Sequence, residues 1–315
     1  MSSRKLICVV GPTACGKTRM GVLLARRYDG EVVSCDSMQI YRGMTVGTAA
    51  PTPEEQEGIP HHMVAVADPA EDYSAARYAR EAGAAVDGIL ARGKRPVIVG
   101  GTGLYLDALL AGHGFAGGQT GGAIRRELEA RLAAEGIGPI LGELRTVDPE
   151  SAARLSPNDH KRIVRALEVY RETGRTMTQH HLDSQSVPPR YSAVKLGFAF
   201  EDRADMREAI DRRVDAMVAQ GLFDEVEALL RAGVPRSATA WQAIGYKECL
   251  RFLDGAGTRE EAVEEIKLRS RQYAKRQLTW LRRDAEIHWF LWKKTRDWDA
   301  ALAFSTEILS SCGVS

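Results

Sequence analysis

LICVVGPTACGKT, residues 6–18, is the stretch of sequence that decides the fold. Residues 6–10 form a short apolar run rich in β-branched side chains, which is typical of a buried strand. Residues 11–18 match the phosphate-binding P-loop pattern at every fixed position, and residues 19–28 follow with the apolar spacing of a helix. This order of strand, glycine loop and helix directs backbone N–H groups and a helix N-terminus to one place, where a diphosphate or triphosphate can bind.

The loop also supplies side chains for phosphate chemistry. Lys17 adds a positive point charge, and the Thr18 hydroxyl is a suitable ligand for Mg²⁺, which we expect as the cofactor. The phosphate contacts that the pattern predicts are Gly11, Thr13, Ala14, Cys15, Gly16, Lys17 and Thr18. Because a P-loop binds any diphosphate, it does not by itself define the reaction.

Further strand and helix signals follow the loop. Apolar runs at 31–34 and 96–99 predict two more buried strands, with a helix from about residue 74 to residue 92 between them. Residues 193–200 alternate like a returning strand, and the chain is then helical to about residue 283. Repeated βα units predict an α/β fold with a P-loop NTPase-like core, in which helices cover both faces of a parallel sheet.

A helical segment interrupts this core. The glycine-rich stretch GHGFAGGQTGG at 112–122 indicates a linker, and helical patterns then continue to a break at Pro188-Pro189. We therefore expect residues 1–115 and 189–315 to form the α/β core with a helical C-terminal part. Residues 116–188 are expected to form an inserted all-helical domain.

Composition excludes several classes of protein. The 315 residues are 44% hydrophobic and 27% charged, which is ordinary for a globular protein and excludes a disordered or collagen-like chain. The N-terminal apolar run is too short for a membrane span, so we expect no membrane association. The five cysteines lack the spacing of a zinc site, so we expect free thiols, no structural metal and a cytoplasmic location. We also expect a monomer without an obligate protein partner.

Two clusters of basic residues occur although the formal net charge is only +1. The first cluster runs from 267 to 283 without an acidic residue and surrounds the aromatic residues Tyr273 and Trp280. Its cations are Lys267, Arg269, Arg271, Lys275, Arg276, Arg282 and Arg283. The second cluster contains Lys161, Arg162 and Arg165. Each cluster alone is more simply explained as a solvated helix face, unless the chain also binds a polyanion.

Polar residues follow two of the expected strands. Asp36-Ser37-Met38-Gln39 comes after the second strand, and Gly100-Gly101-Thr102-Gly103 comes after the third. The carboxyl ends of parallel strands meet at the edge of the sheet where ligands of open α/β sheets bind, so both segments should face the phosphates. There Asp36 can act as a magnesium ligand or a general base, whereas its structural alternative is a helix N-cap.

Six motifs make the chain resemble the tRNA dimethylallyltransferases, also called tRNA isopentenyltransferases, over nearly its whole length. The motifs are GPTACGKT at 11–18, DSMQIYRGMTVGTAAP at 36–51, GGTGLYL at 100–106, NDHKRIVRALEVYRETGR at 158–175, QAIGYKE at 242–248 and RQYAKRQLTWLRR at 271–283. Members of this family move the dimethylallyl group of dimethylallyl diphosphate onto the exocyclic N6 of the adenine just 3′ of the anticodon. The C-terminal zinc finger of eukaryotic members is missing, so the resemblance is to the bacterial type.

The resemblance implies roles for the residues of the first three motifs. The diphosphate of the donor would lie on the P-loop, where Lys17, Thr18 and Mg²⁺ stabilise the charge of the leaving group. Asp36 matches the family residue that accepts the proton of the attacking amine, and Thr102 matches the residue that orients the substrates. Asp36, Thr102 and Lys17 are therefore the expected catalytic residues.

The resemblance also implies contacts with the anticodon stem-loop of tRNA. The adenine must flip out of its stack to react, and phosphate contacts from the basic clusters can offset that cost. The segment before Arg125 departs from the proline-containing stretch that is common in the family. The positions that match RNA-contacting residues are Asp36, Ser37, Met38, Gln39, Thr102, Arg125, Lys161, Arg162, Ile163, Val164, Arg165, Gln242, Ala243, Ile244, Gly245, Tyr246 and Lys247.

Three alternatives remain open on the sequence. An adenylate isopentenyltransferase would use a free adenine nucleotide with the same chemistry, but it would not need the two basic clusters. A P-loop kinase of a small molecule would turn over nucleotide without RNA. A non-enzymatic RNA-binding module would have no use for Lys17, Thr18 and Asp36 around a diphosphate.

Overall fold

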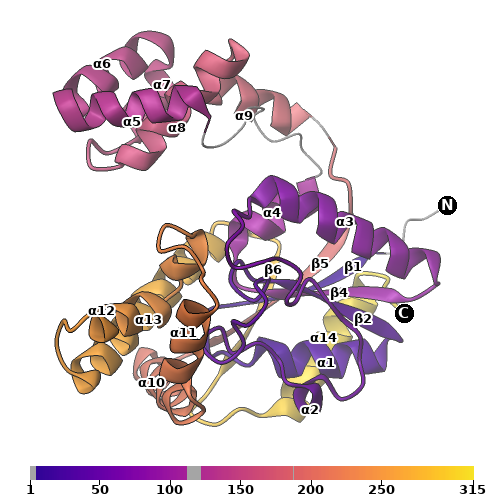
Figure 1. Cartoon of the computed structure of the whole chain (residues 1–315). Coiled ribbons are helices and arrows are strands. Elements are labelled where there is room, and N and C mark those ends of the chain that lie inside the picture. Colours follow the sequence, from indigo (N-terminus) through magenta and orange to yellow (C-terminus); the bar gives the residue numbers. More distant parts are fainter. Residues whose placement is uncertain (1–4, 112–121, 187) are drawn as a thin grey trace. The chain divides into compact units, whose positions relative to one another are not determined.

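The computed structural model describes residues 5–111, 122–186 and 188–315 (Figure 1). These residues form a six-stranded sheet in the order β3-β2-β4-β1-β5-β6, and every pair of neighbouring strands is parallel. The strands are β1 (Leu6–Val10), β2 (Gly30–Cys35), β3 (His61–His62), β4 (Arg95–Gly100), β5 (Ala193–Phe200) and β6 (Ile287–Trp292). The parallel α/β core expected from the βα units is therefore confirmed.

Helices bury both faces of the sheet, and β1 shows why its sequence is apolar throughout. Leu6, Cys8 and Val10 pack on one face with α3 (Ala75–Ala91) and α4 (Gly103–Ala111). Ile7 and Val9 pack on the other face with α1 (Lys17–Arg27) and α14 (Trp298–Ser311). Figure 1 shows these two helical layers on opposite sides of the strands. A strand buried on both faces is a continuous apolar run instead of an alternating one.

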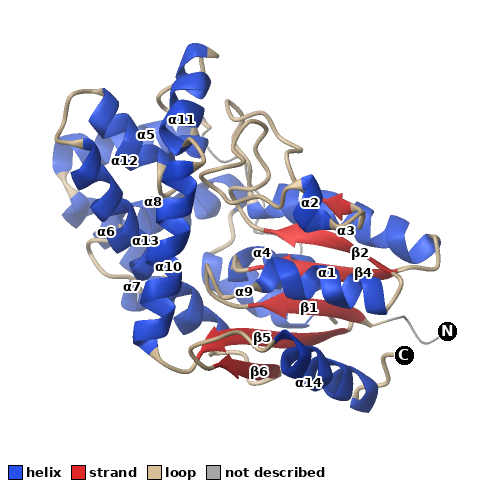
Figure 2. Cartoon of the chain, turned by 90° about the horizontal axis from the view of Figure 1, so that it is seen from below, coloured by secondary structure: helices blue, strands red, loops and turns tan. Residues whose placement is uncertain are grey.

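The structure agrees with the expected strands at 31–34, 96–99 and 193–200, and with a helix between 74 and 92 that Ser74 caps. Two strands were not expected from the sequence. β3 has only two residues, too few for a periodic signal, and β6 lies beside β5 at the opposite edge of the sheet (Figure 2).

A helical group follows β5 in the chain. It contains α10 (Arg203–Ala219), α11 (Leu222–Arg231), a 3-10 turn at Thr239–Gln242, α12 (Tyr246–Leu253) and α13 (Arg259–Leu281). A capping box between Thr258 and Glu261 begins α13, because each residue satisfies a backbone N–H group of the other. Further along α13, the Gln277 amide donates to the carbonyl of Gly101, 3.0 Å away and just beyond the end of β4. This contact brings the helical group to the carboxyl edge of the sheet.

The chain divides into two compact units. Residues 1–110 and 191–315 form the core unit, and residues 111–190 form the helical unit. The helical unit contains α5 (Ala123–Glu135), α6 (Ile137–Val147), α7 (Pro149–Arg154), α8 (His160–Thr173) and α9 (Met177–Ser186), which enclose a separate hydrophobic core. The expected boundary at 115/116 and nearly all of the glycine-rich stretch lie outside the described residues. Within the described ranges, no helix is long and apolar enough to cross a membrane.

Candidate active site

The glycine loop adopts a conformation that requires its glycines. Gly11 has φ 153° and Gly16 has φ 90°, and a Cβ atom on Gly11 would lie 2.2 Å from the carbonyl oxygen of Phe198. The loop therefore runs directly from β1 into the N-terminus of α1, as the pattern requires. The backbone N–H of Thr13 donates to the side-chain oxygen of Gln277 at 2.8 Å. Because Gln277 lies on α13, this bond ties the glycine loop to that helix.

Lys17 lies folded against its own loop. Its ammonium group donates to the carbonyl of Pro12 at 2.6 Å. Burial lowers the pKa of Lys17, and the nearby Arg213 guanidinium also lowers it, whereas Asp36 opposes this effect. An anion bound at the loop would therefore offset both the burial of the Lys17 charge and its repulsion from Arg213.

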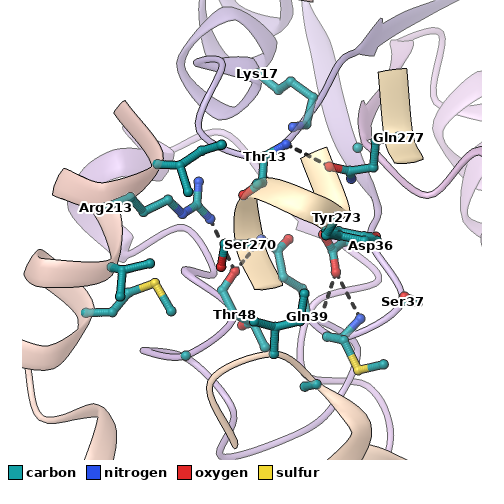
Figure 3. A pocket seen from close by; sticks show the side chains of 18 of the residues that line it. Thr13, Lys17, Asp36, Ser37, Gln39, Thr48, Arg213, Ser270, Tyr273 and Gln277 are labelled. Carbon is teal, nitrogen blue, oxygen red and sulfur yellow. Dashed lines mark hydrogen bonds between the residues drawn. The ribbon is translucent and has the colours of Figure 1, made fainter. Parts of the chain in front are cut away.

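Two cavities in the core unit meet at Lys17, Thr18 and Arg213. The Asp36 cavity has a volume of about 290 Å³, and Figure 3 shows Lys17, Asp36 and Arg213 among its lining residues. The Trp298 cavity has a volume of about 740 Å³ and lies against Gly16, Lys17 and Trp298. Because the two cavities share residues of the glycine loop, two different ligands can reach the loop from separate spaces.

Asp36 and Thr102 lie close together, as their places after neighbouring strands predict. Oδ1 of Asp36 accepts hydrogen bonds from the backbone N–H groups of Met38 at 2.9 Å and Gln39 at 3.4 Å. The Thr102 hydroxyl oxygen accepts from the backbone N–H of Ser37 at 3.2 Å. Oδ2 of Asp36 makes no hydrogen bond with any residue that the structure describes, so one oxygen organises the turn and the other remains available in the cavity.

Tyr273 of α13 also lines the Asp36 cavity, and Figure 3 shows its side chain on the same side of the cavity as Asp36. Burial and the Asp36 charge raise the pKa of Tyr273 to about 12, although the nearby Thr102 side chain acts in the other direction. The phenol therefore stays protonated at neutral pH and can donate a hydrogen bond beside the carboxylate.

Arg213 is a site residue that sequence reasoning missed. It lies on α10 and donates to the carbonyl of Thr48 at 3.4 Å. Burial lowers the pKa of Arg213, and Asp36 opposes this effect. No motif marks Arg213, but the buried stripe formed by Ile210, Val214 and Met217 places it on the same helix face. The one sequence signal for Arg213 is therefore a cation among apolar residues that recur at helical spacing.

Glu225 of α11 holds the loop that borders both cavities. Its carboxylate accepts from the backbone N–H groups of Thr45 and Val46 at 2.8 Å each, and from that of Gly47 at 2.9 Å. The Thr45 hydroxyl and the buried Tyr246 phenol also donate to it. Residues 45–48 line the two cavities on either side, so Glu225 fixes the wall between them.

The side chain of Gln39 is engaged within the protein. Its amide nitrogen donates to the carbonyl of Ala49 at 3.2 Å and to that of Thr48 at 3.4 Å, while its oxygen accepts from the Ser34 hydroxyl at 2.9 Å. Gln39 therefore also holds residues 48 and 49 of the loop that Glu225 positions. A contact of this amide with an RNA base would first have to replace these bonds.

The described residues contain no group of three or more His, Cys, Asp or Glu side chains that could hold a metal ion. Thr18 lines both cavities at the start of α1, and its hydroxyl is the kind of single oxygen ligand that Mg²⁺ accepts when phosphate oxygens and water complete its shell. The residues thus fit a cation that arrives with a diphosphate.

Family models match most of the chain. The IPP transferase model matches residues 39–284, and the isopentenyl transferase model matches residues 4–65. The chain belongs to the IPP transferase family.

Relatives and solved structures of known function agree with this assignment. A tRNA dimethylallyltransferase of Geotalea uraniireducens is 48% identical over 90% of this chain and 91% of the relative. The solved tRNA isopentenylpyrophosphate transferase of Bacillus halodurans has a TM-score of 0.73 and 39% identity, and the match covers 98% of this chain and 97% of that one. A eukaryotic dimethylallyltransferase solved while acting on tRNA has a TM-score of 0.84 and 29% identity, covering 99% and 80%.

In this member of the IPP transferase family, the QAIGYKE segment serves two purposes. Gln242, Ala243 and Ile244 line the Asp36 cavity. Tyr246 is buried against Gly47, Gly245 has φ 100° at the start of α12, and Lys247 is exposed. Residues 242–244 are therefore accessible to a ligand. Tyr246 anchors the segment to Glu225, which holds the loop between the two cavities.

The expected RNA-contacting residues of the helical unit also divide into two kinds. Arg125, Lys161, Arg162 and Arg165 line a cavity of about 560 Å³ within this unit, together with Arg154 and His181. The buried Glu168 carboxylate pairs with Arg165 at 2.8 Å and with Arg125 at 3.3 Å, which orients both guanidinium groups. Ile163 and Val164 are buried in the core of the unit, so their side chains are not available to a ligand.

Proposed function

We propose that this chain transfers the dimethylallyl group of dimethylallyl diphosphate to N6 of the adenine 3′-adjacent to the anticodon of tRNAs. The products are N6-dimethylallyladenosine and diphosphate. The observation that carries this proposal is that the glycine loop and a carboxylate with one unbonded oxygen line the same cavity. The first group suits a diphosphate leaving group, and the second suits a proton that must leave an amine.

The two cavities suggest how the substrates approach. The donor's diphosphate is expected at the loop, where Lys17, Arg213 and the backbone N–H groups surround it. Its dimethylallyl carbon would then point toward Asp36. The adenine is expected in the Asp36 cavity, between Tyr273 and the segment that contains Gln242. This arrangement brings the nucleophilic nitrogen and the electrophilic carbon together beside the carboxylate.

The chemical step requires one bond to break and one to form. The carbon–oxygen bond of the donor breaks, and its electron pair stays on the diphosphate, where Lys17 and Arg213 stabilise the added charge. N6 of adenine forms the new bond to carbon and loses a proton to Oδ2 of Asp36. General base catalysis of this kind typically contributes about 10²–10⁴-fold.

Mg²⁺ is the cation that we propose for this site, with Thr18 as its protein ligand. When bound, it neutralises charge on the leaving diphosphate. A tRNA substrate also leads us to expect the protein in the cytoplasm.

The experiment uses dimethylallyl diphosphate labelled in the prenyl group. The label should appear in unmodified tRNA that carries adenine 3′ of the anticodon, and not in the same tRNA with guanine at that position. AMP and ATP serve as the other acceptors. Transfer to AMP without transfer to tRNA would make this an adenylate isopentenyltransferase, and ATP turnover without prenyl transfer would indicate a kinase.

A further inference from the structure

The basic run of α13 divides into two halves that differ in their partners. In the first half, Lys267 pairs with Asp215 at 2.8 Å and Arg271 pairs with Asp211 at 2.7 Å, both on α10. Arg269 pairs with Glu265 at 3.1 Å. Acids that precede the run or lie on another helix therefore neutralise a segment that contains no acid of its own.

The second half of the run lacks such partners. Four exposed cations occupy it, and none of them makes an ion pair with any residue of the described ranges: Lys275, Arg276, Arg282 and Arg283. Uncompensated positive charge on one exposed segment favours an anionic partner. The footprint of a polyanion on this basic run should therefore be limited to residues 275–283, which comprise the last turns of α13 and the two residues after it.

Two pairs of aromatic and arginine side chains repeat along the same segment. The Arg276 guanidinium lies 5.7 Å from the ring centre of Tyr273, and the Arg283 guanidinium lies 5.4 Å from that of Trp280. The two members of each pair are three residues apart in sequence. Trp280 follows Tyr273 by seven residues, so the two rings share one face of α13 about 10 Å apart along its axis, and Arg283 lies just beyond the end of the helix. The first pair lines the Asp36 cavity, which makes the second pair its continuation outside the cavity.

Trp280 is held in place although it is 38% exposed. Its indole N–H donates to the Asp107 carboxylate of α4 at 3.1 Å. A Cβ atom on Gly103 would lie 2.1 Å from the indole ring, so the side chain rests directly on the residue that follows Thr102. An exposed aromatic ring with a fixed orientation, next to the proposed site of the adenine, has already lost the freedom that binding would otherwise cost.

We propose that Trp280 and Arg283 form a stacking platform for a nucleobase that neighbours the flipped adenine in the anticodon loop. This inference rests on the proposed function. Bases that are splayed out of a loop stack on aromatic side chains and on arginine planes, and such stacking tolerates different bases. The unpaired cations Lys275 and Arg282 would contact the adjoining phosphates. The platform thus sets the path of the loop on the enzyme, while the Asp36 cavity selects the adenine.

The test measures binding of an unmodified anticodon stem-loop that carries 2-aminopurine, one position at a time, on either side of the target adenine. Stacking on the platform should quench the fluorescence of one of these positions in the wild-type complex. Trp280→Ala should abolish that quenching and weaken binding roughly 5- to 150-fold, the range for loss of one base–aromatic stack. Trp280→Phe keeps a ring and should retain part of both effects.

Two variants of the same helix serve as matched controls. Arg269→Ala removes a cation that is already paired, and Leu268→Ala removes an apolar side chain that is 45% exposed. Neither should change the affinity or the quenching. Arg283→Ala should weaken binding without disturbing Gly103, so it separates loss of the platform from damage near Thr102.

The outcomes distinguish this inference from the proposed function. If Trp280→Ala and Arg283→Ala bind the stem-loop with wild-type affinity and quenching, the platform does not exist, even though the wild-type enzyme prenylates tRNA. If wild-type protein transfers no prenyl group, the proposed function fails whatever these variants bind. Weaker stem-loop binding with an unchanged KM for dimethylallyl diphosphate is the result that supports the platform.

Discussion

The two oxygens of Asp36 perform separate tasks, and this separation makes its role testable. Oδ1 holds the turn through Met38 and Gln39, whereas Oδ2 has no hydrogen-bond partner among the described residues. A substitution that preserves an acceptor oxygen should keep the turn intact. The chemical role then depends on whether the second atom can accept a proton.

Asp36→Asn is the corresponding prediction. The amide oxygen can still accept from the backbone of Met38, so affinity for tRNA should remain within about twofold of wild type. The rate of prenyl transfer in a single turnover should fall about 10²–10⁴-fold, because an amide cannot accept the proton. Asp68→Asn is the control, since it makes the same change in an exposed carboxylate that pairs with Arg42 and does not line the Asp36 cavity. A single-turnover rate near the wild-type value for Asp36→Asn would show that another group accepts the proton.

For single residues, the sequence predicts positions just beyond the ends of strands better than positions within distant helices. Lys17 and Asp36 follow strand ends, where topology alone brings them together. Arg213 and Gln277 reach the same place from α10 and α13, and their positions depend on how those helices pack. Nothing local in a helical pattern states which face will meet a glycine loop in a distant part of the sequence, so these residues could not be assigned beforehand.

One side chain, that of Glu225, connects α11 with the site. Glu225 gives α11 its link to the loop at residues 45–47, and it is the only described acceptor for the backbone N–H groups of Val46 and Gly47. Removing it would leave these donors unsatisfied and allow the wall between the cavities to move. Thr48 and Arg213 would move with that wall.

Glu225→Ala should therefore impair catalysis without abolishing folding. We expect kcat/KM for dimethylallyl diphosphate to fall roughly 10- to 100-fold, because displacement of a positioning loop by about 1 Å can cost 10²-fold. Tyr246→Phe, which removes one of the donors to this carboxylate, should have a smaller effect. Glu227→Ala on the same helix is the control, since Glu227 pairs with the exposed Arg231 and with no other residue that the structure describes. Steady-state kinetics with both substrates varied would show whether the loss affects donor KM, as we expect, or tRNA KM alone.

The amino end of β2 contains an ion pair that links the sheet to α3. Glu31 is buried and accepts from Arg92 at 2.6 Å and from His62 at 2.7 Å. Burial alone would raise the pKa of Glu31, but the hydrogen bonds from Arg92 and His62 outweigh it and lower the pKa below its usual value of 4.5. A carboxyl group whose folded pKa is lowered stabilises the fold above its unfolded pKa, and this contribution is lost as the pH falls through the folded pKa.

Arg92→Ala should consequently destabilise the protein in a pH-dependent way. At pH 7 we expect a loss of about 1–3 kcal/mol in the free energy of unfolding, because a buried acceptor loses its charged donor. The difference from wild type should shrink below about pH 4, where Glu31 becomes protonated in the unfolded chain. Urea unfolding at about pH 7 and about pH 3.5 measures both values. Lys94→Ala removes an exposed pair with Asp29 and should change stability by less than about 1 kcal/mol at either pH.

The two strands that sequence analysis missed have different explanations. β6 contains an apolar run at 289–292, which is a strand signal that sequence reasoning overlooked, although only Ile287 and Trp292 of its six residues are buried. β3 forms through two backbone pairings with Val32 and Val33, which follow from the path of the preceding loop. β1 and residues 96–99 of β4 are identifiable because burial on both faces favours a continuous apolar run, whereas β5 is identifiable by its alternation.

At the scale of the whole molecule, the chain leaves the core unit and returns to it at nearly one point. The backbone N–H of Tyr191 donates to the carbonyl of Leu110 at 3.4 Å, and β5 begins two residues later beside β1. The helical unit has a hydrophobic core of its own, built around residues such as Leu128 and Leu167. A short bridge between Leu110 and Tyr191 should therefore leave the sheet and both cavities of the core unit intact.

Replacing residues 112–189 with a short Gly-Ser bridge tests what the helical unit contributes. The shortened protein should bind dimethylallyl diphosphate and inorganic diphosphate with wild-type affinity, because the glycine loop, Arg213 and Asp36 all belong to the core unit. Its affinity for an anticodon stem-loop should fall, and the slope of log affinity against log salt should drop by roughly one unit for each phosphate that the cations around Arg125 no longer neutralise. Calorimetry with diphosphate checks folding of the remaining site independently of RNA. An unchanged salt slope in a protein that still binds diphosphate would mean that α13 alone binds the RNA backbone, and that the cations of the helical unit are a solvated surface.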